Sequence, residues 1–227
     1  MLIVSVDTSG RKGSVALCRG EGEAFEVLQL ISLEGGTYSA QLLPRIAEAL
    51  RRSHIKKDDV DGFVAVSGPG SFTGLRVGLS TLKGLCEVLH TPLATVSMLE
   101  AIVLTHGREK KSATAVLDAG RGEIYVGEYR NESHRATLIQ QYIVKLDEFA
   151  VHDSNLNGDV LTPDTKVAER LQSTNRKIVL VDSVDAAGIG RIGLSKLLRQ
   201  ENADPAEVDV NYIRRSDAEL FARKTQC

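Results

Sequence analysis

The segment Ser67–Gly78 holds the residues of this chain that are best suited to form a loop around an anion. It reads Ser-Gly-Pro-Gly-Ser-Phe-Thr-Gly-Leu-Arg-Val-Gly. It lacks the Gly-Lys-Ser/Thr end of a P-loop, so no lysine is placed to reach a phosphate. It also lacks the Gly-x-Ser-x-Gly pattern of a nucleophile elbow, because Pro69 and Thr73 stand at the outer positions around Ser71. Nucleophilic catalysis by Ser71 is therefore not expected.

Backbone shape and close packing remain as explanations for the glycines. A turn of Gly68, Pro69 and Gly70 would lead sharply from a strand into a helix, which Ser71 or Thr73 could cap. The segment thus predicts a strand, a tight turn and a helix in succession.

Small residues recur along one side of that helix: Gly74, Gly78, Thr81 and Gly84. A glycine inside a helix costs about 1 kcal/mol relative to alanine. The row therefore favours a place where another helix or backbone comes very close. That neighbour is either the chain's own sheet or a partner protein, and composition does not decide between them. Arg76, on the first turn, is a candidate for a salt bridge or a ligand contact.

Two further segments place an aspartate at the end of a strand, before a tight turn. They are Asp7-Thr8-Ser9-Gly10 and Asp118-Ala119-Gly120-Arg121. In phosphotransferases with two related lobes, such turns hold the nucleotide phosphates from both sides, and Asp7, Thr8, Ser9, Asp118, Gly120 and Arg121 are the candidate phosphate-binding residues. The alternative is an Asx-type turn, in which the aspartate accepts bonds from nearby backbone amides. Ala119, which has no hydroxyl, weakens the phosphate interpretation of the second copy.

Histidine and cysteine spacing predicts no metal site. The five histidines are scattered and form neither His-x-x-x-His nor His-Glu-x-x-His. Cys18 and Cys86 stand in apolar segments and Cys227 is the last residue, so we expect buried free thiols rather than disulfides or metal ligands. Free thiols fit a reducing cytoplasm.

Composition excludes several classes of function. The formal charge is −2, with ten aromatic residues and no tryptophan, so the chain has neither a basic stripe nor stacking platforms for nucleic acid. We expect any contact with RNA to need a partner. The first apolar stretch, Leu2–Val6, is too short for a signal peptide, and no stretch approaches the roughly 20 apolar residues of a membrane span. A soluble, cytoplasmic protein is expected.

Hydrophobic periodicity predicts an α/β protein with a mixed sheet. Three strands come first, followed by alternating helices and strands through residue 105. The first helix has its apolar face at Leu42, Ile46, Ala49 and Leu50, with Ser39 as a plausible N-cap. Further on we expect strands near 124–130, 136–144 and 178–181, and helices near 163–171 and 189–198.

An internal repeat indicates two related lobes. Asp7 and Asp118 each end a strand and are followed by a glycine turn with an arginine and then by a second strand. The copies are about half the chain apart. We therefore expect an N-terminal lobe of residues 1–111 and a C-terminal lobe of residues 112–205, with 206–227 packing back on the first lobe.

The motif Ser67–Gly78 closely resembles the hallmark of the TsaB family, also called YeaZ, whose members are needed to make threonylcarbamoyladenosine in bacterial tRNA. Three shorter matches support it: Asp7-Thr-Ser9, Ser39-Ala-Gln-Leu-Leu-Pro44 and Asp118-Ala-Gly-Arg121. The resemblance extends over about residues 1–130, and beyond them only Tyr212-Ile-Arg214 matches. It implies an actin-like ATPase fold of the sugar-kinase and Hsp70 type, with two related lobes.

The resemblance also implies a role without catalysis. TsaB is a paralogue of the transferase TsaD, which carries a metal-binding histidine motif on its first long helix. The matching segment here, Gly36–Leu42, has no histidine, and Tyr38 stands where many TsaB sequences keep one. TsaB-like proteins pair with TsaD, join the ATPase TsaE, form homodimers when alone, and meet tRNA only through the complex. No cofactor is implied for this chain, although ATP or ADP could bind at the complex or between the lobes.

The helix after the glycine turn is one that TsaB-like proteins use for pairing with TsaD. We therefore predict a partner interface at Ser67, Gly68, Pro69, Gly70, Ser71, Phe72, Thr73, Gly74, Arg76, Val77, Gly78 and Thr81. Two alternatives stay open: an actin-like phosphotransferase or ATPase that acts alone through its aspartate turns, and a metallopeptidase, against which the missing histidine pair argues.

Overall fold

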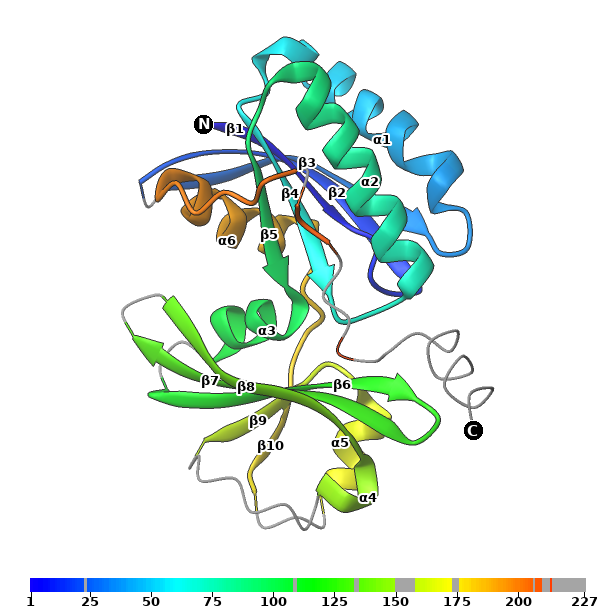
Figure 1. The fold of residues 1–227 in the computed structure, drawn as a ribbon, viewed down its shortest axis with the longest axis vertical. Coiled ribbons are helices and arrows are strands. Elements are labelled where there is room, and N and C mark those ends of the chain that lie inside the picture. The colour runs from blue at the N-terminus through cyan, green and yellow to red at the C-terminus, as the bar shows by residue number, and fades with distance from the viewer. Residues whose placement is uncertain are drawn as a thin grey trace.

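The structure is a computed structural model that describes residues 1–22, 24–107, 110–132, 135–149, 158–172, 176–205, 207–209 and 213. The chain forms two lobes, one above the other in Figure 1, each built on a five-stranded sheet. Among the described residues, no helix is long and apolar enough to cross a membrane.

The first lobe begins with three antiparallel strands and continues into alternating helices and strands. Its elements are β1 (Leu2–Asp7), β2 (Lys12–Glu21), β3 (Ala24–Glu34), α1 (Tyr38–Arg52), a 3₁₀ turn (Lys57–Asp59), β4 (Gly62–Gly68), α2 (Phe72–Leu89), β5 (Leu93–Ser97) and α3 (Met98–His106). The sheet order is β3-β2-β1-β4-β5, with β1 antiparallel to β2 and parallel to β4. The predicted order of elements through residue 105 is confirmed.

The second lobe repeats this plan. Its elements are β6 (Ser112–Gly120), β7 (Glu123–Glu132), β8 (Arg135–Lys145), α4 (Leu146–Phe149), β9 (Asp159–Thr162), α5 (Thr165–Leu171), β10 (Ile178–Leu180) and α6 (Ala186–Leu198). The sheet order is β8-β7-β6-β9-β10. Again the first strand is antiparallel to the second and parallel to the fourth. The α/β class and the two related lobes with mixed, helix-flanked sheets, as in the actin-like fold, are thereby confirmed.

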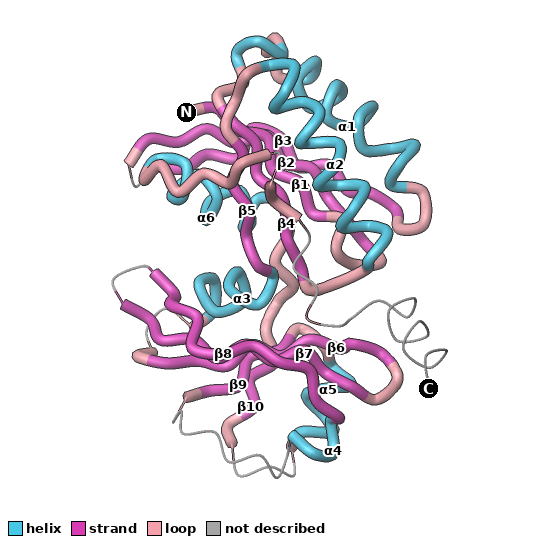
Figure 2. The backbone as a smooth tube through the Cα atoms, in the orientation of Figure 1, coloured by secondary structure: helices cyan, strands magenta, loops and turns pink. Residues whose placement is uncertain are grey.

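The central strands are apolar because helices cover both faces of the first sheet. All six residues of β1 are buried, as expected for a strand without a solvent face. Helices α1 and α2 lie side by side on one face, and α6 lies on the other (Figure 1, Figure 2). The edge strand β3 instead alternates near its end, with Ile31 and Leu33 buried and their neighbours exposed.

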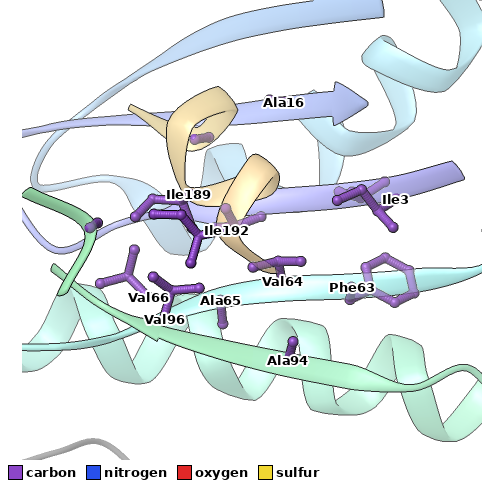
Figure 3. Packing of buried hydrophobic residues seen from close by; sticks show 14 of the residues in the cluster. Ile3, Ala16, Phe63, Val64, Ala65, Val66, Ala94, Val96, Ile189 and Ile192 are labelled. Atoms are coloured by element: carbon purple, nitrogen blue, oxygen red, sulfur yellow. The ribbon is translucent and has the colours of Figure 1, made fainter. Parts of the chain in front are cut away.

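The two lobes exchange their last helices. Helix α6 follows the second sheet in sequence but packs on β1, β2 and β4, while α3 follows the first sheet and packs on β6 and β7. Figure 3 shows Ile189 and Ile192 of α6 beside Val64 and Val66 of β4. At Gly193, an added Cβ would lie 2.2 Å from Val64 Cγ1, so only glycine permits this approach. The division into residues 1–111 and 112–205 stays a prediction.

Hydrogen bonds fix the start of α6 between β1 and β2. Ser14 Oγ accepts a bond from the backbone nitrogen of Ala186 at 2.9 Å, and Ser5 Oγ donates to the carbonyl oxygen of Ala186. Asp185 caps the helix by accepting bonds from Ala187 N and Gly188 N at 2.9 and 3.0 Å. The buried serines of the first sheet therefore hold a helix that arrives from the second lobe.

Several local predictions differ from the structure. The N-cap of α1 is Thr37, not Ser39. The strand β9 and the single turn α4, of four residues each, were not predicted. Cys18 and Cys86 are buried free thiols, as expected, and Cys227 lies outside the described residues.

The predicted return of residues 206–227 to the first lobe falls mostly outside the described residues. Just before it, Ala203 N donates to Leu93 O at 2.8 Å, so the chain runs along the edge strand β5. Lys83 Nζ on α2 donates to Val208 O at 3.0 Å. Val208 and Ile213 pack against the larger hydrophobic core, to which the first lobe contributes most residues.

Helices α3 and α6 are joined by a largely buried ion pair. Lys196 Nζ lies 2.7 Å from Glu100 Oε2 and also donates to Thr95 O at 3.2 Å. The two side chains are only 19% and 15% exposed. Removing one partner leaves the other charge desolvated and unpaired, which is costly.

We expect Lys196→Met to lower the free energy of unfolding by about 1–3 kcal/mol, because Glu100 would lose its partner. The matched control is Arg52→Met. Arg52 is 53% exposed and pairs with Glu48, so this change also removes the partner of a glutamate. This change should cost clearly less, because exposed ion pairs contribute little to stability. Urea unfolding measures both. Equal losses would show that the pair between α3 and α6 adds nothing beyond an exposed one.

Candidate functional site

The candidate functional site is a cleft where the two lobes meet. A cavity of about 680 Å³ lies between the Asp7 turn, the glycine segment, the start of α1 and the first turn of the second sheet. Ser9 and Gly10 contribute to it from the first turn, and Asp118 and Ala119 from the second. The structure thus brings together the two repeated turns and the glycine segment, which are distant in sequence.

Asp7 forms the base of the first turn. Its Oδ1 accepts bonds from Ser9 N at 2.8 Å and from Ser9 Oγ at 2.6 Å. Burial raises the pKa of the Asp7 carboxyl, the bonds from Ser9 oppose this rise, and the charge of Asp185 adds to it. The Asx-type turn is therefore confirmed at Asp7, with a carboxylate that the fold holds away from water.

Asp118 forms the same turn in the second lobe. Its Oδ1 accepts a bond from Gly120 N at 2.8 Å, and its own backbone nitrogen donates to Asp164 Oδ2 at 2.8 Å. Unlike Asp7, it is exposed. Gly120 and Arg121 do not line the cleft; together with Asp118, which lines both, they line a neighbouring cavity of about 360 Å³. The six candidate phosphate-binding residues therefore do not converge as one set, and phosphate binding stays a prediction.

The glycines of α2 face the chain itself. An added Cβ at Gly74 would lie 2.1 Å from Thr8 O, and one at Gly78 would lie 2.3 Å from Thr8 Oγ1. Both glycines are buried. The prediction that Gly74 and Gly78 form a bare surface for a partner is wrong, because the backbone that comes so close is the Asp7 turn. Gly84 is exposed, with nothing within 4 Å of an added Cβ.

The turn before α2 is bonded to the same strand end. Ser71 N donates to Ser9 O at 2.6 Å, and Ser71 Oγ accepts a bond from Gly74 N at 3.3 Å, so Ser71 is the N-cap. Gly70 has φ +159°, and an added Cβ would lie 2.4 Å from Ser9 O. Glycine is required here by the close approach of the Ser9 backbone.

The other predicted interface residues divide by exposure. Gly68 and Pro69 are buried, Ser67, Val77 and Thr81 are half-buried, and the exposed residues are Gly70, Ser71, Phe72, Thr73 and Arg76. The guanidinium carbon of Arg76 lies 3.9 Å from the centre of the Phe72 ring. The exposed start of α2 therefore presents an aromatic and a cationic side chain as one stacked unit.

Tyr38 has an internal role at the edge of the cleft. Its hydroxyl donates to Gly10 O at 2.8 Å, which ties α1 to the Asp7 turn. Burial raises the pKa of Tyr38, and the charge of Asp7 adds to the rise. Within the described part of the chain, no group of three or more His, Cys, Asp or Glu side chains could hold a metal ion.

We expect Gly74→Ala and Gly78→Ala each to lower the free energy of unfolding by about 1–3 kcal/mol, because the new methyl group would overlap with Thr8. The control is Gly84→Ala, in an open position of the same helix, which should raise stability by up to about 1 kcal/mol. Chemical unfolding of the three variants measures these changes. Stable alanine variants at 74 and 78 would contradict the internal packing.

We expect Asp7→Asn to stabilise the protein at pH 7. The pKa of Asp7 is higher in the folded protein than in the unfolded chain, so the ionised carboxylate disfavours folding above the folded pKa. Asparagine keeps an oxygen that can accept the bonds from Ser9. The gain should shrink as the pH falls through the folded pKa.

Urea unfolding over a pH series measures this difference. Asp118→Asn, in the exposed equivalent turn, is the control and should show a smaller gain. An Asp7→Asn variant that is less stable than the unmodified protein at pH 7 would mean that the negative charge holds the turn together.

Comparison with known proteins agrees with this architecture. The family model of TsaD, tRNA N6-adenosine threonylcarbamoyltransferase, matches residues 35–161, more than half of the chain. A Pseudomonas aeruginosa crystal structure, of an uncharacterized protein described as similar to the peptidase YeaZ, has a TM-score of 0.76 and 23% identity. The alignment covers 94% of this chain and 99% of that one, which shows a shared fold.

Relatives found by sequence identify the group within this family. The tRNA threonylcarbamoyladenosine biosynthesis protein TsaB of Escherichia coli (strain K12) is 30% identical over 170 residues, covering 73% of this chain and 71% of the relative. The Bacillus subtilis (strain 168) TsaB is 28% identical over 143 residues, 63% of this chain. The match spans only 60% of that relative's length. The chain belongs to the TsaD family and, within it, to the TsaB (YeaZ) group.

Proposed function

We propose that this chain acts in the formation of threonylcarbamoyladenosine in tRNA, as a non-catalytic subunit that binds and supports a TsaD-like transferase together with a TsaE-like ATPase. The observation that carries the proposal is membership of the TsaB group, since the relatives of that name are described as biosynthesis proteins for this nucleoside. The model of the transferase family, which matches residues 35–161, supports the same pathway.

The geometry of the cleft favours a supporting role over catalysis. Two polar groups at or beside the cleft are engaged within the chain: Asp7 accepts hydrogen bonds from Ser9, and the Tyr38 hydroxyl donates to Gly10 O. Gly74 and Gly78 hold α2 against the same turn. We interpret the Asp7 turn as a structural element that fixes the orientation of α2 relative to the first sheet. The start of this helix is thereby held exposed at the surface.

The partner surface that we propose is narrower than the twelve residues expected from sequence. It is the exposed start of α2, with Phe72, Thr73 and Arg76 at its centre. Because Arg76 is stacked on Phe72, the pair offers contact area to a partner at little cost in conformational entropy. Aromatic residues and arginine are the types that dominate binding at protein interfaces.

The rest of the proposal follows from the same role. The chain forms a homodimer when the transferase is absent, meets tRNA only within the complex, and works in the cytoplasm without a cofactor of its own. The second candidate function is a phosphotransferase or ATPase that binds ATP or ADP between the lobes. The two aspartate turns at one cavity favour this alternative. Turnover of ATP by the isolated chain would contradict the non-catalytic role.

We expect Phe72→Glu to weaken binding to the TsaD-like transferase at least about tenfold, because it removes the aromatic half of the stack and adds a negative charge. The control is Leu198→Glu, since Leu198 is 42% exposed, close to the 38% of Phe72, and lies at the end of α6 on the other face of the first sheet.

Gel filtration and calorimetry with the purified transferase measure this binding, and transfer to tRNA in the reconstituted system gives a second readout. Both should fall for Phe72→Glu and stay unchanged for Leu198→Glu. Full binding by a folded Phe72→Glu variant would place the partner elsewhere. Transfer that does not need this chain would overturn the proposed function itself.

A further inference from the structure

A second cavity, of about 490 Å³, lies at the opposite end of the junction between the lobes. Residues from the β2–β3 hairpin, α3, the start of β8 and α6 line it, and none of them lines the cleft. Because Leu2 pairs with Arg19 and Asp7 with Ser14, the β2–β3 turn lies beyond the amino end of β1, away from the Asp7 turn. The volume is within the range of pockets for small molecules.

Positive charge exceeds negative charge in this pocket. Its cationic side chains are Arg135, Arg191, Lys196 and Arg199. Lys196 is neutralised by Glu100. One carboxylate, Glu201, forms ion pairs with both Arg135 and Arg199. Among the described residues, no carboxylate pairs with Arg191. The described side chains therefore leave an excess of two positive charges around one concave surface.

The two arginines that share Glu201 hold it in a fixed position. Arg199 Nε lies 3.0 Å from Glu201 Oε1 and Arg199 Nη2 lies 3.2 Å from Oε2, while Arg135 Nη2 bonds to Oε1 as well. The bond from Arg199, and then the charges of both arginines, lower the pKa of Glu201. The Glu201 carboxylate thus shows how this group of arginines binds an anion, while leaving part of their charge uncompensated.

Arg191 forms a flat wall of the same pocket. Its guanidinium carbon lies 4.7 Å from the centre of the Phe25 ring, and both residues line the cavity. A guanidinium plane held over an aromatic ring is a stacking surface for a nucleobase. Cations for a phosphate and a planar surface for a base are therefore combined within one pocket.

The kind of anion follows from the extent of the positive surface. The chain as a whole has a formal charge of −2 and no basic stripe, which disfavours a long nucleic acid. From these features we infer that the pocket binds a single nucleoside phosphate, with its phosphate at Arg135 and Arg199 and its base at the Arg191–Phe25 stack. This site is separate from the cleft and does not depend on the proposed function.

Calorimetric titration of the full chain with AMP at low ionic strength tests the inference. We expect Arg191→Gln to weaken binding about tenfold, because one charge-assisted contact and the stacking plane are lost. Glu201→Gln should instead strengthen binding, since it frees Arg135 and Arg199 for the phosphate. The control is Arg52→Gln, an exposed arginine of α1 on the other face of the sheet, which should change nothing.

Three outcomes would overturn the inference. The first is no binding of AMP, or equal affinity for the unmodified chain and a folded Arg191→Gln variant. The second is binding of inorganic phosphate as tight as that of AMP, which would remove the base from the assignment. The third is binding of a short single-stranded RNA, but not AMP, through Arg191, which would identify the pocket as a backbone contact for RNA.

Discussion

The contact between Thr8 and the glycines of α2 is the constraint on which the rest of this structure depends. Side-chain-free positions at Gly74 and Gly78 let the helix lie directly against the end of β1. The position of α2 then sets the Ser71 cap, the path of Gly70 beside Ser9, and the wall of the cleft. A methyl group at either glycine would move all three, so the spacing of four residues serves internal geometry first.

The exchange of the last helices explains why the lobes share one interface instead of being connected only by the chain. Helix α6 completes the first sheet, and α3 covers the second. Ser5 and Ser14 bond to the start of α6, and Lys196 bonds to Glu100 near its end. A sheet of this kind needs cover on both faces, and each lobe obtains part of that cover from a helix adjoining the other.

Much of the fold could be predicted from the sequence, because its signals are local. Strand periodicity, the repeated Asp-turn motif and the Ser71 cap all lie within a few consecutive residues. The direction in which the glycines face could not be predicted, since both an internal and an external neighbour require the same spacing. The pocket around Arg191 was missed for another reason: its cations come from separate elements that only the exchanged helix brings together.

The burial of Gly74 and Gly78 limits how a partner could recognise α2. Buried glycines cannot be touched, so recognition at α2 must depend on the side chains that the glycine contact pushes outward. Phe72 and Arg76 are exposed because the opposite side of the same turn is pressed against Thr8. In the proposed partner interface, the glycine motif would contribute indirectly, as the rigid support of a small aromatic and cationic surface. Close packing of the backbone alone can therefore make such a motif restrictive in sequence, because an added methyl group at Gly74 or Gly78 would overlap with Thr8.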